Sequence, residues 1–240
     1  MSIASEITRL QAAKSDLATS IANKGVTVPS SATLDDYAAL VDSIQTGGGG
    51  GSTLPYDAEV EYLGGDGASY IDTGMKASGI LHIKTYLVDF FTSAAGAWPF
   101  GGRNAYNNNA YGMFVAANTG KLNVAYNGAT NVFNSYSSYP QSCWVEMKSG
   151  SIKVGSTTHT FSAKTFTSSY NVWLFGMNNG GSLAGNYTCK IGTTFIYDGT
   201  TMKYLIPVRV GQVGYFYDKI SGTLIGNAGS GSFVLGNDVD

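Results

Sequence analysis

A run of five glycines at positions 47–51 divides this 240-residue chain into two parts with different sequence patterns. Glycine has more backbone freedom than any other residue, so such a run is tolerated only where no packing is required. With Ser52 the run forms a flexible joint, which we place at residues 47–53. The sequence therefore predicts a small N-terminal segment, residues 1–46, and a larger domain, residues 54–240.

The N-terminal segment begins with a heptad pattern. Apolar or long side chains recur at intervals of four and three residues, which is the seam of a coiled coil: Ile3, Ile7, Leu10, Lys14, Leu17 and Ile21. A polar residue at one seam position, here Lys14, sets register and strand number. We expect a helix over residues 3–24 that associates with copies of itself. The alternative is an amphipathic helix of a globular bundle.

A second helix is expected soon after the first. Gly25 ends the first helix and Pro29 prevents its simple continuation. Thr33 is the predicted N-cap, with Asp36 three residues later as a variant of the capping box. The segment then forms a helical hairpin that thickens the oligomerising foot.

Beyond residue 54 the apolar pattern changes to a period of two in many short runs. Asp66-Gly67, Asn127-Gly128, Asp198-Gly199 and Ser221-Gly222 supply turns, and we also expect a turn at residues 178–180. Short strands with closely spaced turns predict a mainly β domain, an antiparallel β-sandwich or barrel. The expected strands are 58–63, 70–73, 80–91, 112–116, 121–126, 143–148, 151–154, 157–161, 172–176, 189–197, 202–209, 213–218 and 232–235.

Charge excludes several kinds of partner. Residues 1–46 carry a net charge of −2, whereas the rest of the chain holds 11 basic and 11 acidic residues without a Lys/Arg cluster. A neutral domain of this kind is not expected to bind nucleic acid or anionic lipid. We expect no membrane insertion and no secretion leader, hence folding in a cytoplasm. Cys143 and Cys189 are expected to be buried thiols or one disulfide.

Two stretches of the larger domain resemble a known family. They are residues 61–74, EYLGGDGASYIDTG, and residues 217–233, YDKISGTLIGNAGSGSF. They resemble the first and last strands of concanavalin A-like (LamG-type) jelly rolls found in gut bacteria and their phages. The resemblance covers roughly residues 56–238. It implies two packed sheets, often with one concave face, and commonly carbohydrate binding, without a fixed set of ligand residues.

The N-terminal segment carries a second resemblance. Residues 7–14, 24–29 and 34–37 resemble segments of phage and prophage tail, baseplate and fibre proteins, where they typically precede a Gly-rich spacer. This resemblance implies a location in the virion and association with other virion proteins. It also implies a homotrimer, although Ile at a with Leu at d would by itself favour two strands.

The residues argue against catalysis and against an obligatory metal or cofactor. Glycoside hydrolases need two carboxylates, and Glu59 with Glu61 is the nearest candidate pair, but the Glu-x-Asp-x-x-Glu signature is absent. His82 and His159 show no metal-ligand spacing. The remaining oxygen-donor candidates for calcium are expected to cap turns: Asp66, Asp72, Asp198 and Asp218.

A ligand is instead expected at polar loops rich in aromatic residues. Aromatic rings pack on the apolar face of a sugar, while amide, guanidinium and backbone groups meet its hydroxyls; such residues also make adaptable protein-binding loops. The alternative for each aromatic residue is a place in the core. The candidates are Trp98, Arg103, Asn104, Tyr106, Asn107, Asn108, Asn109, Tyr111, Tyr136, Tyr139, Asn178 and Asn179.

The sequence thus predicts a phage fibre or decoration protein that oligomerises through its N-terminal helices and presents a lectin-like domain to a host-surface glycan or receptor. A purely structural capsid or tail component without a ligand is one alternative. A bacterial surface lectin is another.

Overall fold

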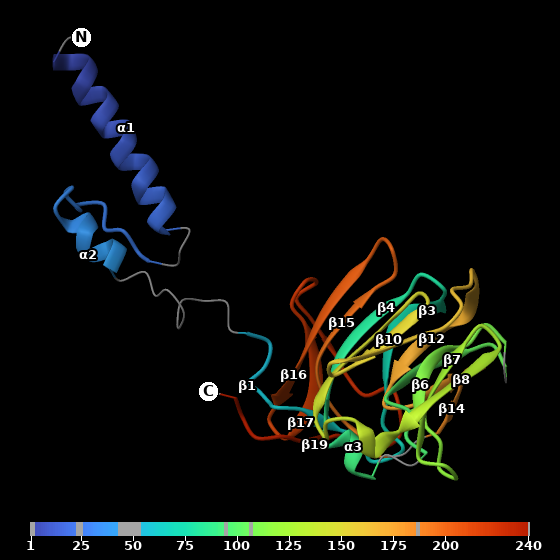
Figure 1. Ribbon diagram of the computed structural model, residues 1–240. Helices are drawn as coiled ribbons and strands as arrows, with labels where there is room; N and C mark the ends of the chain where they lie inside the picture. Colours follow the sequence, from blue (N-terminus) through green and yellow to red (C-terminus); the bar gives the residue numbers. More distant parts are fainter. Residues whose placement is uncertain are drawn as a thin grey trace. The chain divides into compact units, whose positions relative to one another are not determined.

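The structure is a computed structural model that describes residues 3–22, 26–42, 54–93, 96–105, 108–185 and 188–239. The chain divides into two compact units, Met1–Leu54 and Pro55–Asp240. The glycine-rich joint predicted at residues 47–53 lies outside the described residues. The first unit is helical, and the second is built almost entirely of strands (Figure 1).

The first unit contains a long helix, α1 (Ile3–Ala22), and a short one, α2 (Asp36–Asp42). The predicted return of the chain is confirmed, because Ile21 of α1 is buried against Ala32 and Tyr37. The Tyr37 hydroxyl donates to the Lys14 carbonyl at 3.4 Å, and the Lys14 ammonium lies 6.0 Å from the centre of the Tyr37 ring. A small cluster of side chains therefore holds α2 beside α1.

Asp36 organises the start of α2. Its carboxylate accepts hydrogen bonds from the Thr33 amide at 2.6 Å and the Thr33 hydroxyl at 2.8 Å. These bonds hold the pKa of Asp36 below its ordinary value. The bond from the Thr33 amide to the Asp36 carboxylate is the one that the predicted capping box requires. The Thr33 hydroxyl, which a capping box uses as an acceptor, here donates to the same carboxylate.

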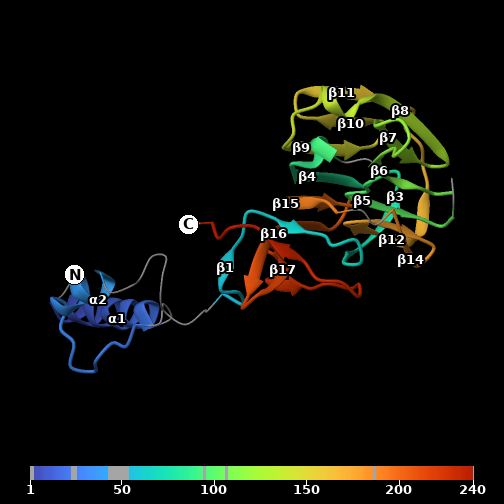
Figure 2. The ribbon, with the colours of Figure 1, turned by 90° about the horizontal axis from the view of Figure 1, so that it is seen from below.

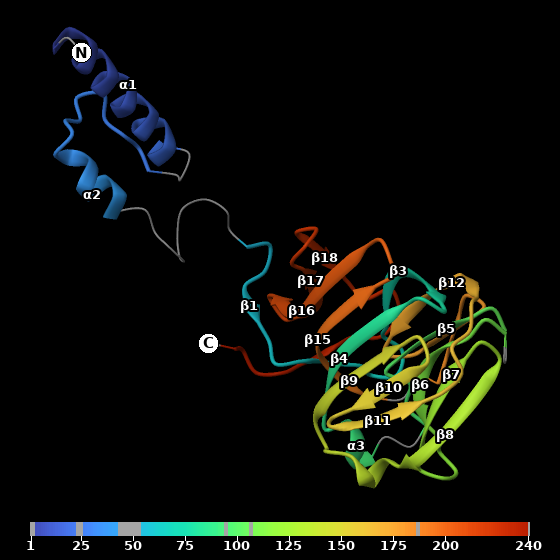
Figure 3. The ribbon, with the colours of Figure 1, turned by 45° about the horizontal axis from the view of Figure 1, so that its top comes forward.

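The second unit consists of two facing sheets and is a β-sandwich. The first sheet has the order β11 (Thr157–Thr160), β10 (Ser151–Val154), β9 (Cys143–Lys148), β4 (His82–Val88), β15 (Lys190–Tyr197), β16 (Met202–Val210), β17 (Val213–Asp218), β18 (Thr223–Ile225), with β1 (Ala58–Glu59), β2 (Leu63–Gly64) and β19 (Val234–Leu235) beside them. Figure 3 shows these strands following one another from β18 to β11.

The second sheet has the order β14 (Ser182–Ala184), β13 (Met177–Asn179), β5 (Phe100–Arg103), β6 (Tyr111–Val115), β7 (Lys121–Tyr126), β8 (Ala129–Ser135). Two further strands, β12 (Thr167–Leu174) and β3 (Ile71–Ser78), belong to this sheet, with β12 pairing both β3 and β5. Figure 2 shows the two sheets as separate layers. The described strand pairs are antiparallel apart from β13 with β5.

Buried and less buried side chains alternate along the strands, and the buried ones fill the space between the sheets. Ile83 and Leu87 of β4 are fully buried, whereas the residues between them are half-buried apart from Thr85. Tyr111 lies wholly inside, and its hydroxyl donates to the Met147 carbonyl of the opposite sheet at 2.7 Å. This bond satisfies a polar group that would be costly to bury alone. This bond is a direct polar link between the layers.

Several strands begin and end at the residues predicted from the sequence. The strands expected at 121–126, 143–148, 151–154 and 213–218 are confirmed as β7, β9, β10 and β17. The turn at Asn127-Gly128 is also confirmed, with φ of 44° and 81°, the left-handed conformation that a two-residue hairpin requires.

Other predicted boundaries were wrong. The strand expected at 80–91 ends at Val88, because Asp89 adopts a φ of 49° and the chain enters the short helix α3 (Phe90–Ser93). Asn178 and Asn179 belong to β13, and the turn follows at Gly180 and Gly181. The strand expected at 58–63 is broken into β1 and β2.

Candidate functional site

One row of residues crosses four strands at the outer face of the first sheet. Val88 of β4 pairs with Lys190 of β15, which pairs with Gly64 of β2, which in turn pairs with Val234 of β19. The preceding or following residues of these strands, such as Leu87 and Ile191, are buried in the core, so the row faces outward. Gly64, in the middle of the row, has no side chain.

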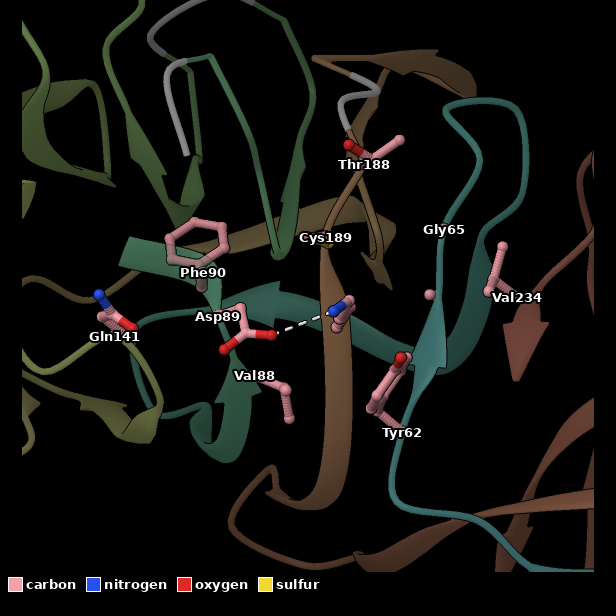
Figure 4. A pocket seen from close by; sticks show the side chains of 11 residues that line it. Tyr62, Gly65, Val88, Asp89, Phe90, Gln141, Thr188, Cys189 and Val234 are labelled. Atoms are coloured by element: carbon pink, nitrogen blue, oxygen red, sulfur yellow. Dashed lines mark hydrogen bonds and ion pairs between the residues drawn. The ribbon is translucent and has the colours of Figure 1, made fainter. Parts of the chain in front are cut away.

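Residues around this row, Gly64 among them, line a hollow in the surface, a pocket of about 610 Å³. Figure 4 shows Asp89, which follows β4, and Phe90, the first residue of α3, on one side and Tyr62 on the other. We call it the Asp89–Lys190 pocket. Its lining residues are Tyr62, Gly64, Gly65, Val88, Asp89, Phe90, Gln141, Thr188, Cys189, Lys190 and Val234.

The pocket contains an ion pair that is open to solvent. The Lys190 ammonium lies 3.1 Å from a carboxylate oxygen of Asp89 and 4.9 Å from the centre of the Tyr62 ring. The hydrogen bond to Asp89 raises the pKa of Lys190, which keeps the ammonium charged at neutral pH. Burial raises the pKa of Cys189 to about 12, which keeps this thiol protonated and unreactive.

Asp89 has an unusual backbone conformation for a residue with a side chain. Its φ of 49° is left-handed, which is uncommon outside glycine. The Asp89 amide donates to the Ser142 hydroxyl at 2.8 Å, and that hydroxyl donates to the Asp89 carboxylate at 3.3 Å. Ser142 therefore supports the conformation that holds the carboxylate at the pocket.

Several predicted ligand residues gather at one end of the second sheet. The Arg103 guanidinium donates to the Asn179 side chain at 2.8 Å across the parallel pair β5 and β13. The Asn104 side chain accepts hydrogen bonds from the hydroxyl of Ser168 at 2.7 Å and the amide of Ser169 at 2.8 Å. Arg103, Asn104 and Asn179 thus lie in one region, although their side-chain hydrogen bonds largely link neighbouring parts of the sandwich to one another.

Asn104, Asn108 and Asn109 lie between β5 and β6. Asn104 and Asn108 are joined by a backbone hydrogen bond of 3.1 Å, and Asn108 is exposed. The Asn109 side chain donates to the Thr167 carbonyl at 3.0 Å. Tyr106 and Asn107, which were also predicted to contact a ligand, lie outside the described residues.

Three of the predicted residues are interior. Tyr111 lies in the core, and Tyr139 is buried with its hydroxyl 2.8 Å from the His159 ring. Asn178 is also buried, and its side chain donates to the Asn171 carbonyl and accepts the Gly181 amide. As placed, these side chains stabilise the sandwich and present no surface to a ligand.

The remaining predicted aromatic residues lie apart from the Arg103 region or pack on the core. Trp98 is half-buried and stacks on Phe114, with ring centres 4.1 Å apart. Tyr136 opens the 3-10 helix η1 (Tyr136–Ser138) and packs partly against the core. The structure therefore does not gather the candidates into one binding surface.

A second hollow lies beside the loops whose sequences carried the jelly-roll resemblance. Tyr70 and Trp173 stack with ring centres 3.9 Å apart, and with Leu183 and Gly229 they border a cavity of about 540 Å³. Trp173 is almost fully buried, and its ring nitrogen has no hydrogen-bond partner within the described residues. Neither ring of this pair was among the residues predicted to bind a ligand.

The acidic pair considered for glycoside hydrolysis has structural partners. The Glu59 carboxylate accepts from the Tyr56 hydroxyl at 3.1 Å and lies 3.4 Å from the Lys219 ammonium. The Glu61 carboxylate accepts from the Asn237 side chain at 3.1 Å. His82 lies 3.0 Å from Glu146. In the described part of the chain, no three His, Cys, Asp or Glu side chains come together as a metal site.

No known protein family and no curated protein matches this chain. Within the described ranges, no helix has both the length and the apolar character needed to cross a membrane.

The Asp89–Lys190 pocket was not predicted from the sequence, because its row depends on the register of four strands that lie far apart in the chain. The one local signal in the sequence was Gly64-Gly65, two residues without side chains close to the aromatic Tyr62.

Proposed function

We propose that this chain is a non-enzymatic phage virion protein, a fibre or decoration protein, that self-associates through its helices and presents its β-sandwich to a host-surface glycan or receptor. The observation that carries the proposal is the exposed apolar stripe of α1. Its members Ile7, Leu10 and Leu17 have exposed fractions of 51%, 49% and 40%.

The stripe fits association with further copies of the same chain. Of the six predicted seam residues, Ile21 is buried within the unit and Lys14 contacts Tyr37, while the side chain of Ile3 lies outside the described residues. The three exposed residues follow heptad spacing along one side of the helix, which is the arrangement by which helices of identical chains pack. Burying them would stabilise an assembly by roughly 25 cal/mol per Å² of apolar surface removed from water.

The β-sandwich is proposed to be a concanavalin A-like jelly roll. Its two stretches of resemblance are brought together by hydrogen bonds from the Ser232 amide to the Asp66 carboxylate and from the Tyr70 amide to the Asn227 side chain. The Asp89–Lys190 pocket provides a concave, partly polar surface of the kind that binds small ligands. Several copies held together would convert weak individual sites into strong attachment.

Light scattering of the full-length chain after gel filtration tests the self-association. We expect the native chain to form a homo-oligomer, with a trimer as the state that the resemblance to phage fibres favours. Replacing Ile7, Leu10 and Leu17 together by Ser should yield monomers, because the shared apolar surface is lost. A matched control replaces the exposed Ile80, Val132 and Val213 of the sandwich by Ser and should leave the mass of the assembly unchanged. A monomeric native chain would contradict the proposal.

Immunogold labelling of intact particles tests the virion assignment. Antibodies against the sandwich should decorate particles of a phage that encodes this chain. Labelling together with the absence of any glycan or receptor binding would instead favour a purely structural capsid or tail component. Absence of the chain from purified particles would exclude the virion assignment and favour a bacterial surface lectin.

A further inference from the structure

We propose that the Asp89–Lys190 pocket binds a neutral saccharide through two adjacent hydroxyl groups of one sugar ring, one donating to Asp89 and the other accepting from Lys190. This inference rests on the proposed ligand-binding function of the sandwich and assigns that function to a particular place and ligand class.

Charge selects the class of ligand. Among the lining residues Asp89 is the one acidic and Lys190 the one basic side chain, and the two groups are 3.1 Å apart. An anion would be attracted by Lys190 and repelled by Asp89, and the reverse holds for a simple cation. A neutral ligand with both donors and acceptors meets no such conflict, and its hydrogen bonds to charged groups are stronger than those between neutral groups.

Geometry favours two neighbouring hydroxyls. The Asp89 carboxylate can only accept hydrogen bonds and the Lys190 ammonium can only donate them. Their side chains are 53% and 39% exposed, so both charged groups are reachable from the pocket. A hydroxyl is both donor and acceptor, and hydroxyls on adjacent ring carbons have a spacing similar to that of the ion pair. One ring can therefore satisfy both charged groups at once.

The apolar part of the lining fits the carbon skeleton of a sugar. Val88 and Val234 are neighbours of Lys190 and Gly64 in the row, and the Tyr62 ring stands at the side (Figure 4). Gly64 lies between them without a side chain and is closely flanked by both neighbours: a Cβ there would lie 3.3 Å from that of Val234 and 3.8 Å from the Lys190 side chain. Apolar walls beside one polar pair match a ring with apolar and hydroxyl-bearing parts.

The backbone of Asp89 provides an independent observation. A left-handed residue other than glycine persists only where its surroundings hold it, and such residues are concentrated at functional sites. Here Ser142 holds the residue, as the hydrogen bonds described above show. The carboxylate is thus oriented before the ligand arrives, which reduces the entropy lost on binding.

An array that carries neutral and sialylated glycans tests the proposal with the full-length chain. We expect binding to one or more neutral glycans. Asp89→Asn keeps the size of the side chain and suits a left-handed backbone, but it removes the charge and should reduce the signal at least ten-fold. Lys190→Met should have a similar effect.

The pair Glu59 and Lys219 provides matched controls on the same sheet. Lys219 lies 3.4 Å from Glu59 and 5.7 Å from the centre of the Tyr204 ring, so this pair repeats the ion pair and its aromatic neighbour outside the pocket. Glu59→Gln and Lys219→Met should leave glycan binding unchanged. Thermal unfolding of all four variants establishes that each is folded at the assay temperature.

The outcomes separate this inference from the proposed function. Glycan binding that survives Asp89→Asn and Lys190→Met would overturn the pocket assignment and leave a glycan-binding sandwich in place. Binding to sialylated glycans alone would overturn the neutral ligand class. Calorimetry with free glycine tests a zwitterion, whose two charges could also match the ion pair; binding of glycine without binding of any neutral glycan would overturn the proposal as well.

Discussion

Asp66 and Ser232 are 166 positions apart, yet the Asp66 carboxylate accepts the Ser232 amide at 2.6 Å. The same carboxylate accepts the amides of Ala68 and Ser69 at 2.9 and 2.8 Å. Nearby, the Asn227 side chain accepts the Tyr70 amide at 3.0 Å. Side chains from two ends of the sandwich sequence thus fasten its first and last segments together.

We expect Asp66→Ala to lower the free energy of unfolding of the sandwich by about 1–3 kcal/mol, because three amides lose a charged acceptor. The melting temperature would fall by roughly 2–4 °C for each kcal/mol lost. Calorimetry measures both quantities. Asp198→Ala is the control: Asp198 accepts only the nearby Thr200 and Thr201 amides among the bonds described for it, so its loss should cost less. Equal costs would show that the long-range bond adds nothing.

The same carboxylate predicts a dependence on pH. Its hydrogen bonds, first that from Ser232, lower the pKa of Asp66 from 3.8 to about 2. A carboxyl with a lowered folded-state pKa stabilises the fold above its unfolded-state value, and this contribution is lost as the pH falls toward the folded-state value. The stability difference between the native chain and Asp66→Ala should therefore shrink between about pH 4 and pH 2. Unfolding in urea at each pH measures it, and a constant difference would refute the assignment.

The two cysteines are expected to be unreactive in the folded chain. Cys143 and Cys189 are both free and buried, and burial raises the pKa of each thiol, that of Cys189 to about 12. Since the thiolate is the reactive form, a thiol reagent at about pH 8 should label neither residue quickly. Addition of denaturant should release two thiols per chain. Rapid labelling of the native chain would mean that these residues are not packed as described.

Tyr37 is predicted to hold the helical unit together. It is buried against Ile21 and Ala32, so Tyr37→Ala opens a cavity that costs about 3–5 kcal/mol in an ordinary core. Such a loss should separate α2 from α1 and increase hydrogen exchange of the amides of both helices. Leu34→Ala, which alters an exposed side chain of the same segment, should leave the exchange pattern intact. Unchanged protection in Tyr37→Ala would contradict the described packing.

The sequence predicts the two-part organisation and most strands because both depend on local patterns. The heptad spacing of α1 and the Asn127-Gly128 turn are examples of such patterns. By contrast, β5, which contains Gly101 and Gly102, was not among the predicted strands. Close packing requires Gly102, since a Cβ there would lie 2.6 Å from the Asn171 carbonyl oxygen. A glycine that permits close approach has the same local signature as a glycine in a turn.

The site was harder to predict than the fold for a related reason. Asp89 and Lys190 are 101 positions apart and meet only because β4 and β15 pair in one particular register. The predicted loop residues Tyr111 and Tyr139 have the composition of a binding surface, but burial places them inside. Whether an aromatic side chain points inward depends on the phase of its strand, which a polar neighbourhood in the sequence does not reveal.

Retention on a surface coated with a neutral glycan that the chain binds tests most directly whether the helical unit makes the sandwich multivalent. The native chain is compared with the variant in which Ile7, Leu10 and Leu17 are replaced by Ser. Both should show the same affinity per site for the soluble glycan. On the surface the variant should bind about 10²–10⁴ times more weakly, because simultaneous attachment of several copies is lost. Equal retention of the two proteins would contradict the account.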